Sequence, residues 1–270
     1  MTDSPKSTVT IPSQSNIRVC ARIRPLAKYE LENGSKQIVD SLPTFSKTSA
    51  APITGPTVEP EVLEVKPPNA QKRWFELDAV FDGKSTQRDV YVKSGAQQAV
   101  KNDIFKGFNC TILAYGQTGS GKTFSMGTAA GSMEIKETDG IIPRATADLF
   151  RMIKAKCDGN AQVDVSYLEI YNEEIRDLMV DKGDAEELRI RETLNGDVYV
   201  SGLKTKQVAN PGEVGKFMEI ASKRRVVGST KMNAVSSRSH AICALHVKGV
   251  LEDSTKFLSL IHISEPTRPY

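Results

Sequence analysis

The sequence lacks any run of apolar residues approaching the roughly 18 needed to cross a bilayer. Its amino terminus, MTDSPKSTVTIPSQSN, also lacks the apolar stretch of a secretion signal. The 4 cysteines are far apart, with no CxxC pair, and only 3 histidines are present. This scarcity argues against a disulfide scaffold and a structural zinc site. Together these absences favour a reducing, cytoplasmic location without a membrane segment.

The chain also lacks a strong excess of residues of one charge sign. The chain has 36 Lys and Arg against 33 Asp and Glu, a net charge of +3. That imbalance is too small to predict direct binding to nucleic acid or to an acidic membrane. The 39% hydrophobic and 26% charged residues in a chain of 270 are typical of a globular protein with one large domain.

Strand and helix patterns alternate along the chain, which predicts an α/β fold with one core. Residues 1–15 are rich in Ser, Thr and Pro and are interpreted as a flexible tail, so the fold is expected to begin at residue 16. Residues 30–60 have too few apolar positions for a core and are interpreted as a surface insertion. Strands are expected near 17–23, 62–65, 74–81, 111–115, 163–167, 188–190, 198–200 and 241–247, and helices over 89–105, from Pro143 and from Pro211.

A glycine-rich segment between a predicted strand and a predicted helix matches the phosphate-loop pattern GxxxxGK followed by Ser or Thr. Glycines let the backbone wrap phosphates closely, and a helix start adds partial positive charge. Lys122 is expected to reach the β- and γ-phosphates and Thr123 to coordinate Mg²⁺. A Gly/Ser turn without a ligand is the alternative. The candidate loop consists of Gly116, Gln117, Thr118, Gly119, Ser120, Gly121, Lys122 and Thr123.

The loop belongs to a longer stretch, residues 107–127, which resembles the nucleotide-binding region of the kinesin motor domain. Three more segments agree with that family in order and spacing: the RIRP sequence at 22–25, YLEIYNE at 167–173, and NAVSSRSH at 233–240. The resemblance covers about residues 16–257. It implies a P-loop NTPase with a central mixed sheet flanked by helices, which uses ATP and Mg²⁺. The GIIPR and LEIYNEEIRDLM wording is most similar to the chromokinesin-like group.

The resemblance implies that Arg22, Arg24 and Pro25 lie against the adenine. Their chemistry is suitable, because a guanidinium, a flat proline ring and the aromatic face of Phe124 can sandwich a purine. The alternative is that the arginines are solvated strand ends.

The NAVSSRSH segment resembles kinesin switch I. Ser236 and Ser237 then place hydroxyls near the γ-phosphate or a Mg²⁺-bound water, with Ser237 as a metal contact and Arg238 beside them. A serine-rich loop without a ligand is the alternative. His240 is open to interpretation as a packed histidine, and His246 is interpreted as structural.

Microtubules are the partner that the family implies, since tubulin has an acidic surface. Lys204 and Lys206, after a predicted hairpin, are candidate contacts. The basic group 223–225 is better explained as favourable charge at the end of a helix. Location on the cytoskeleton follows from the same resemblance, with oligomerisation assigned to a stalk absent from this chain.

The switch II sequence DLAGSE of kinesins does not appear, so Arg238 lacks its expected partner. Instead, residues 258–270 begin LSLIHISEPTR, which resembles a translated sequencing adapter, and they are expected to be a non-native tail. The competing hypothesis is a genuine end in which Leu258, Leu260 and Ile261 complete a buried strand. The intact parent is expected to hydrolyse ATP and this chain to hydrolyse it poorly. A non-catalytic, nucleotide-dependent interaction module and a different P-loop enzyme remain as alternatives.

Overall fold

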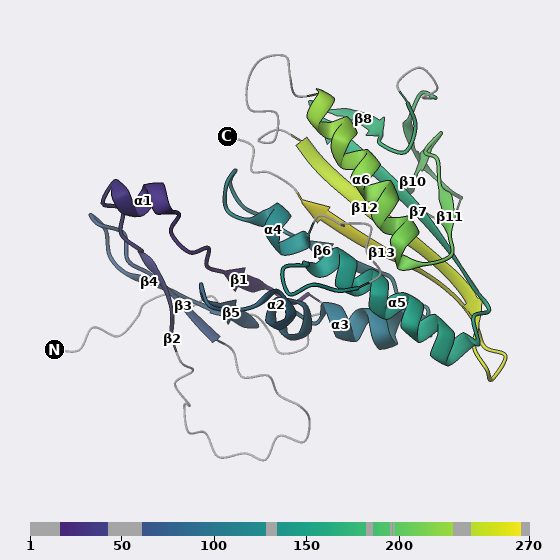
Figure 1. The fold of residues 1–270 in the computed structure, drawn as a ribbon, viewed down its shortest axis with the longest axis horizontal. Helices are drawn as coiled ribbons and strands as arrows, with labels where there is room; N and C mark the ends of the chain where they lie inside the picture. The colour runs from purple at the N-terminus through teal and green to yellow at the C-terminus, as the bar shows by residue number, and fades with distance from the viewer. Residues whose placement is uncertain are drawn as a thin grey trace. The chain divides into compact units, whose positions relative to one another are not determined.

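The computed structural model describes residues 17–42, 61–127, 134–181, 186–194, 196, 198–228 and 239–265. The chain divides into two compact units, Met1–Gly95 (unit 1) and Ala96–Tyr270 (unit 2), and each is described by itself. Figure 1 shows the elements of both. No helix in the described ranges is long and apolar enough to cross a membrane.

Unit 1 contains two small sheets. In one, β1 pairs in parallel with β5, and in the other, β2, β3 and β4 form an antiparallel meander. The predicted strands at 62–65 and 74–81 are confirmed as β3, β4 and β5. The elements are β1 (Cys20–Arg22), α1 (Lys28–Glu32), β2 (Val39–Leu42), β3 (Glu61–Val65), β4 (Arg73–Leu77), β5 (Ala79–Phe81) and α2 (Gln87–Lys93).

Part of the stretch interpreted as a surface insertion is regular structure. Within 30–60, α1 extends to Glu32 and β2 pairs with β3 along its whole length, from Val39 opposite Val65 to Leu42 opposite Val62. An edge strand needs only backbone partners and one apolar face, so a segment poor in apolar residues can still form one. Residues 43–60 lie outside the described ranges.

The helix predicted over 89–105 is divided. A capping box starts α2, in which Thr86 Oγ1 accepts from the Asp89 amide at 3.1 Å and the Asp89 carboxylate accepts from the Thr86 amide at 2.9 Å. Gly95, with φ +87°, then interrupts the helix. Three short helical pieces follow in unit 2: α3 (Ala96–Gln98), the π-helix η1 (Ala99–Asp103) and the 3₁₀-helix η2 (Ile104–Lys106).

Unit 2 is built on a mixed six-stranded sheet in the order β11-β7-β12-β13-β6, with β8 paired to β7. Only the β13–β6 pair is parallel among these described strands. A separate hairpin is formed by β9 (Arg189–Glu192) and β10 (Val198–Ser201), in the region of the predicted hairpin, and Ile190 lies opposite Val200. The sheet strands are β6 (Cys110–Leu113), β7 (Ala161–Tyr171), β8 (Glu174–Asp177), β11 (Lys206–Val208), β12 (Ser239–Val250) and β13 (Lys256–Glu265).

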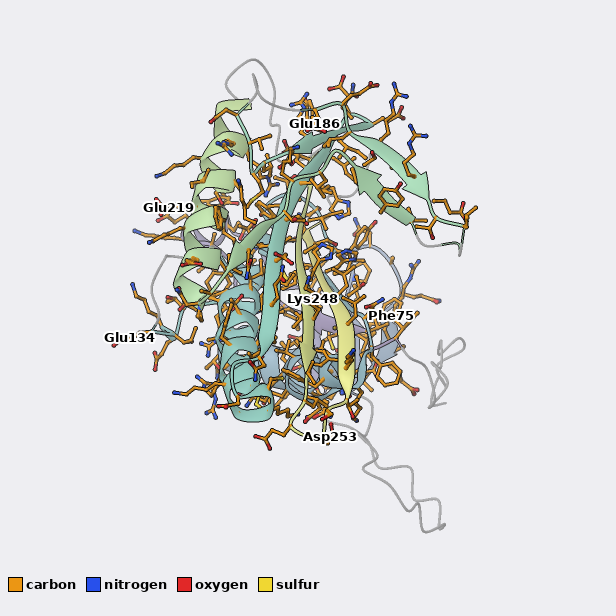
Figure 2. All side chains as sticks on the ribbon, turned by 90° about the vertical axis from the view of Figure 1, so that its right-hand side faces the viewer. Phe75, Glu134, Glu186, Glu219, Lys248 and Asp253 are labelled. Carbon is orange, nitrogen blue, oxygen red and sulfur yellow. The ribbon has the colours of Figure 1, made fainter. Side chains whose placement is uncertain are left out.

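The core lies between one face of this sheet and the helices. Leu245 of β12 sits in register with Val165 of β7 and Ile261 of β13, and all three are at most 1% exposed. The two long helices, α5 (Ile141–Cys157) and α6 (Pro211–Gly228), lie on the same side of the strands (Figures 1 and 2). An α/β fold with a mixed sheet and flanking helices is therefore confirmed.

Both long helices bury most of the face that their apolar spacing predicts, but Met152 of α5 and Phe217 of α6, which belong to those predicted faces, are only half-buried. Ala145, Leu149 and Ile153 of α5 are at most 5% exposed. On α6, Val214, Met218 and Ala221 are buried, and Asn210 accepts from the Glu213 amide at 3.1 Å as its cap. The structure starts α5 at Ile141, two residues before the predicted start at Pro143. Proline fits anywhere in the first turn, because amides there have no partner within the helix.

The predicted non-native tail overlaps the centre of the sheet. β13 pairs with β12 from Lys256 opposite Val250 to Glu265 opposite Ala241, and its buried residues are Phe257, Ser259, Ile261, Ile263 and Ser264. Of the three residues that the competing hypothesis places in a buried strand, Ile261 is buried, Leu260 is half-buried and Leu258 is 70% exposed. Residues 266–270 lie outside the described ranges, and the non-native origin of the segment stays a prediction.

Candidate nucleotide site

The predicted phosphate loop connects β6 to a short helix, α4 (Lys122–Met126). The strand side is fixed by the Ala114 amide, which donates to the Ser264 carbonyl at 2.9 Å. Gly119 and Gly121 have φ of +78° and +93°, a region that residues with a Cβ rarely adopt. A Cβ on Gly116 would meet Ser120 Oγ at 2.6 Å. Gly119 and Gly121 thus have a conformational reason to be glycine, whereas a side chain at Gly116 would require the Ser120 side chain to move.

The lysine of the motif bends back over its own loop. Lys122 Nζ donates to the carbonyl oxygens of Gly116 and Gln117, both at 2.9 Å. The alternative, a Gly/Ser turn without a ligand, gives no reason for the lysine side chain to lie over the loop. The ammonium is therefore held where the motif predicts that phosphate oxygens bind.

The residues after the lysine lie on α4. Thr123 and Phe124 are both exposed, and the side chain of Phe124 has a relative exposure of 57%. An exposed hydroxyl next to the lysine is suitable for a hard cation, and an exposed aromatic face is suitable for stacking on a base. The exposure of Thr123 is compatible with the predicted Mg²⁺ contact, which stays a prediction.

α4 is held against the start of α5 by two glycines. A Cβ on Gly140 would lie 2.4 Å from the Gly127 amide nitrogen, and a Cβ on Gly127 would lie 2.7 Å from the Gly140 amide nitrogen. This contact was not predicted from the sequence. The signal that could have indicated it is the position of the two glycines, Gly127 directly after α4 and Gly140 directly before α5.

The residues predicted to contact adenine belong to unit 1. Arg22 Nη1 donates to Gln87 Oε1 at 2.7 Å, and burial lowers the pKa of Arg22. Arg24 forms an ion pair with Glu30 at 2.6 Å, and this hydrogen bond raises the pKa of Arg24 and lowers that of Glu30. Pro25 packs near Gly83. A purine sandwich with Phe124 stays a prediction, because it combines residues of both units.

Ser236, Ser237 and Arg238 lie outside the described residues, but the residues on either side of their segment form a buried polar cluster. Arg225 of α6 has its Nε 3.4 Å from Glu169 Oε1 of β7, and its Nη2 donates to Ser239 Oγ of β12 at 2.9 Å. Glu169 and Ser239 are 5% and 2% exposed. Sequence reasoning missed this cluster, since it attributed Arg225 to helix-end charge.

The histidines agree with a structural interpretation. Among the described side chains, the buried Nε2 of His240 has no hydrogen-bond partner, and burial, with the charge of Arg225, lowers the pKa of His240. Burial also lowers the pKa of His246, against the opposing effect of Asp164.

One of the two candidate microtubule contacts forms an ion pair within the chain. Lys204 forms an ion pair with Glu186, whereas Lys206 is exposed on β11. In the basic group at the end of α6, Lys223 pairs with Glu219 at 2.8 Å and Arg224 with Asp181 at 2.8 Å. The group is thus explained by ion pairs, together with the Arg225 contacts.

Comparison with known proteins decides the family. The sequence profile of the kinesin motor domain matches residues 22–263. The chain belongs to the kinesin motor domain family. It is similar to kinesin-related protein 5 of Dictyostelium discoideum, with 36% identity over 248 residues, which cover 89% of this chain and 22% of that protein.

Other kinesins are about equally similar. Chromosome-associated kinesin KIF4A of Homo sapiens is 36% identical over 92% of this chain and 19% of its own length. The kinesin-like protein klp-20 of Caenorhabditis elegans is 41% identical over 86% of this chain and 33% of its own length. These identities do not single out the chromosome-associated group. The chain spans a third or less of these relatives.

A solved kinesin structure has the same fold. It is described as the structure of a fast kinesin, with implications for ATPase mechanism and interactions with microtubules, and it is 33% identical to this chain. The TM-score is 0.76, over 93% of this chain and 65% of that one. The kinesin motor fold predicted from the four sequence segments is therefore confirmed.

Proposed function

We propose that this chain binds Mg²⁺-ATP at residues 116–123, as the nucleotide-binding part of a kinesin that hydrolyses ATP and moves along microtubules. The observation that carries the proposal is the position of Lys122, whose ammonium lies on the carbonyls of Gly116 and Gln117 at 2.9 Å above a turn built from glycines. Membership of the kinesin motor domain family supports the choice of ATP and of microtubules.

The main contribution of the chain's own residues is to position the phosphates, the metal and the attacking water. Lys122 exchanges its two carbonyl acceptors for phosphate oxygens and brings a full positive charge to the γ-phosphate. Thr123 presents its hydroxyl to the metal from the first turn of α4. When bound, Mg²⁺ supplies charge that offsets the negative charge developing on the transferred phosphoryl group. By resemblance, Ser236, Ser237 and Arg238 orient the attacking water.

The proposal assigns the adenine to Arg22, Arg24, Pro25 and Phe124, as in the family. Because Arg24 is paired with Glu30, its guanidinium is held rather than free to rotate, which is suitable for stacking. Lys206, with the exposed hairpin residues Ile190 and Tyr199, supports a contact to an acidic, partly apolar partner surface such as tubulin. Activity by the chain alone is expected to be low, because the sequence contains no DLAGSE segment.

Titration with a fluorescent ATP analogue in the presence of Mg²⁺ tests the nucleotide site. The wild-type chain is expected to bind, and Lys122→Ala to lose at least about tenfold in affinity, since a charge-assisted hydrogen bond contributes about 1.5–3 kcal/mol. Lys216→Ala, which removes an exposed lysine of α6, is the matched control and should bind like wild type. Equal affinity of the two variants would overturn the proposal.

Microtubule-stimulated phosphate release separates the motor from the non-catalytic module. The parent protein that contains this chain is expected to release phosphate faster when microtubules are added. Nucleotide binding without any turnover in that protein would favour the interaction module instead.

A further inference from the structure

The guanidinium of Arg144 closes a turn that lies just before α5. Its Nε donates to the Asp139 carbonyl at 2.8 Å. Its Nη2 donates to the carbonyls of Lys136 at 2.9 Å and Glu137 at 3.2 Å. Arg144 itself belongs to the first turn of α5, so its side chain reaches back to the residues that precede the helix. One side chain therefore binds three backbone carbonyls of residues 136–139.

Asp139 closes the same turn from within. Its amide donates to the Lys136 carbonyl at 3.1 Å, and its carboxylate accepts from the Lys136 amide at 2.7 Å. The Lys136 carbonyl thus accepts both from this amide and from Arg144, which uses both of its lone pairs. Residues 136–139 belong to no helix or strand, so these bonds hold the backbone of the turn in place.

The turn leads directly into Gly140, which is buried against the last turn of α4. A Cβ on Gly140 would lie 2.4 Å from the Gly127 amide nitrogen and 2.5 Å from the Ser125 carbonyl oxygen. The Gly127 amide in turn donates to the Thr123 carbonyl at 2.8 Å. Because Arg144 holds the carbonyl of the residue just before Gly140, it limits how far Gly140 can move away from α4.

α4 is so short that its position depends on its neighbours. It consists of Lys122–Met126, so its first and last turns overlap. A helix of this length is not stable in isolation and takes its placement from tertiary packing. A displacement of its last turn therefore also moves Lys122 and Thr123, the residues that are expected to bind the phosphates and Mg²⁺.

We infer that Arg144 is a positioning residue of the nucleotide site, which acts through Gly140 to hold α4, and with it Lys122 and Thr123, in the geometry that binds Mg²⁺-ATP. The inference rests on the proposed function. A lysine at 144 would keep the charge but offer one flexible ammonium in place of a planar fork, so it does not hold all three carbonyls. α4 then samples other positions, and the apparent Kd rises by the fraction of molecules that have left the binding geometry.

The test measures the Kd of a fluorescent, non-hydrolysable ATP analogue with Mg²⁺. The proteins are wild type, Arg144→Lys, Arg151→Lys, Gly140→Ala and the double variant with Gly140→Ala and Arg144→Lys. Arg151→Lys is the matched control, because Arg151 lies on the same helix but pairs with Asp148. Hydrogen exchange of residues 122–127 and of β12 is followed in wild type and in the two single arginine variants.

Arg144→Lys is expected to raise the Kd at least about fivefold, the equivalent of roughly one hydrogen bond, whereas Arg151→Lys should bind like wild type. In the Gly140→Ala protein the contact is already disturbed, so the further change Arg144→Lys should alter the Kd less than about twofold. Two substitutions that act through one contact are not additive, whereas independent effects add. Amide protection of residues 122–127 should fall in Arg144→Lys while that of β12 is retained, and general destabilisation would lower both.

Equal Kd values for Arg144→Lys and Arg151→Lys would overturn the inference alone, and so would fully additive effects in the double variant. The single variants and the exchange measurements test the inference without the double variant, should that protein fail to fold. A wild-type chain that does not bind the analogue would overturn the proposed function and the inference with it.

Discussion

Gly140 and Gly127 are in backbone contact at the junction of α4 and α5, so close that a Cβ on Gly140 would lie 2.4 Å from the Gly127 amide nitrogen. Gly140 has an extended backbone with φ −82°, which any residue can adopt. Its requirement for glycine is therefore one of space and not of conformation. This contact joins the helix that carries Lys122 and Thr123 to the long helix that packs on the sheet.

Replacement of Gly140 by alanine should destabilise the chain by about 1–3 kcal/mol, the usual range for overpacking, and also weaken nucleotide binding, because α4 must move away from α5. Gly107→Ala is the comparison, since Gly107 has nothing within 4 Å of a Cβ but has φ +84°, so that it carries the conformational cost of alanine without the steric clash. Urea unfolding and nucleotide titration measure both effects. A Gly140→Ala variant that binds nucleotide as tightly as Gly107→Ala would contradict this account.

Asp177 is expected to be important for stability, because its buried carboxylate accepts from the amides of Met179 at 2.7 Å and Lys204 at 2.8 Å. Asp177→Ala leaves both amides without this acceptor and should lower the free energy of unfolding by about 2–6 kcal/mol, at roughly 1–3 kcal/mol for each buried unpaired group. Asp181→Ala removes a carboxylate that is 80% exposed and pairs with Arg224, so its effect should stay below about 1 kcal/mol. Similar denaturation midpoints for the two variants would refute the assigned role.

Stability should decrease as the pH is lowered below about 6.5, the unfolded pKa of histidine. Burial lowers the pKa of His240, His246 and His262 in the folded state, with His246 adding to the effect on His262. The unfolded chain then binds more protons than the folded chain between the two pKa values, so the free energy of unfolding is fully retained above 6.5 and is lost on acidification. Urea midpoints at pH 7.5 and 5.5 measure this difference, and His246→Gln should reduce it.

A lysine substitution should have opposite effects on the two faces of β13. Ile261 faces the core and is 0% exposed, whereas Leu258 is 70% exposed on the other face. Ile261→Lys should abolish cooperative unfolding, because it buries an unpaired charge. Leu258→Lys should leave the melt unchanged and increase the soluble fraction, since it removes an exposed apolar side chain from the face opposite to that of Ile261. Thermal unfolding followed by circular dichroism checks the effect on the melt, and light scattering of the two variants checks the soluble fraction.

Much of the fold follows from local patterns in the sequence. The alternation of Val163 and Val165 predicted β7, and the apolar spacing of Val214, Met218 and Ala221 predicted the inner face of α6. β2 was missed because pairing of an edge strand depends on its neighbour and leaves little hydrophobic signal in the strand itself. The division of the helix at Gly95 was missed because a single glycine is tolerated in many helices.

The site shows the same division between local and long-range information. The phosphate loop was predictable because the reaction needs glycines and a lysine at fixed spacing, and the geometry of Gly119, Gly121 and Lys122 agrees. The Arg225–Glu169 contact joins residues from distant parts of the sequence, so no local pattern indicates it. The roles of Ser236, Ser237 and Arg238 remain predictions.

Among the strands that the structure describes in unit 2, only β13 pairs with β6, the strand that leads into the phosphate loop. In the sheet of unit 2, β6 is the terminal strand and pairs with residues 261–264 of β13, and the Ala114 amide extends the same ladder to Ser264. The strand that precedes Gly116 is therefore held in place by residues 261–264, which belong to the segment predicted to be non-native. A different sequence at 258–265 would change the stability of β6, and with it the order of the phosphate loop, even if every residue of the loop were retained.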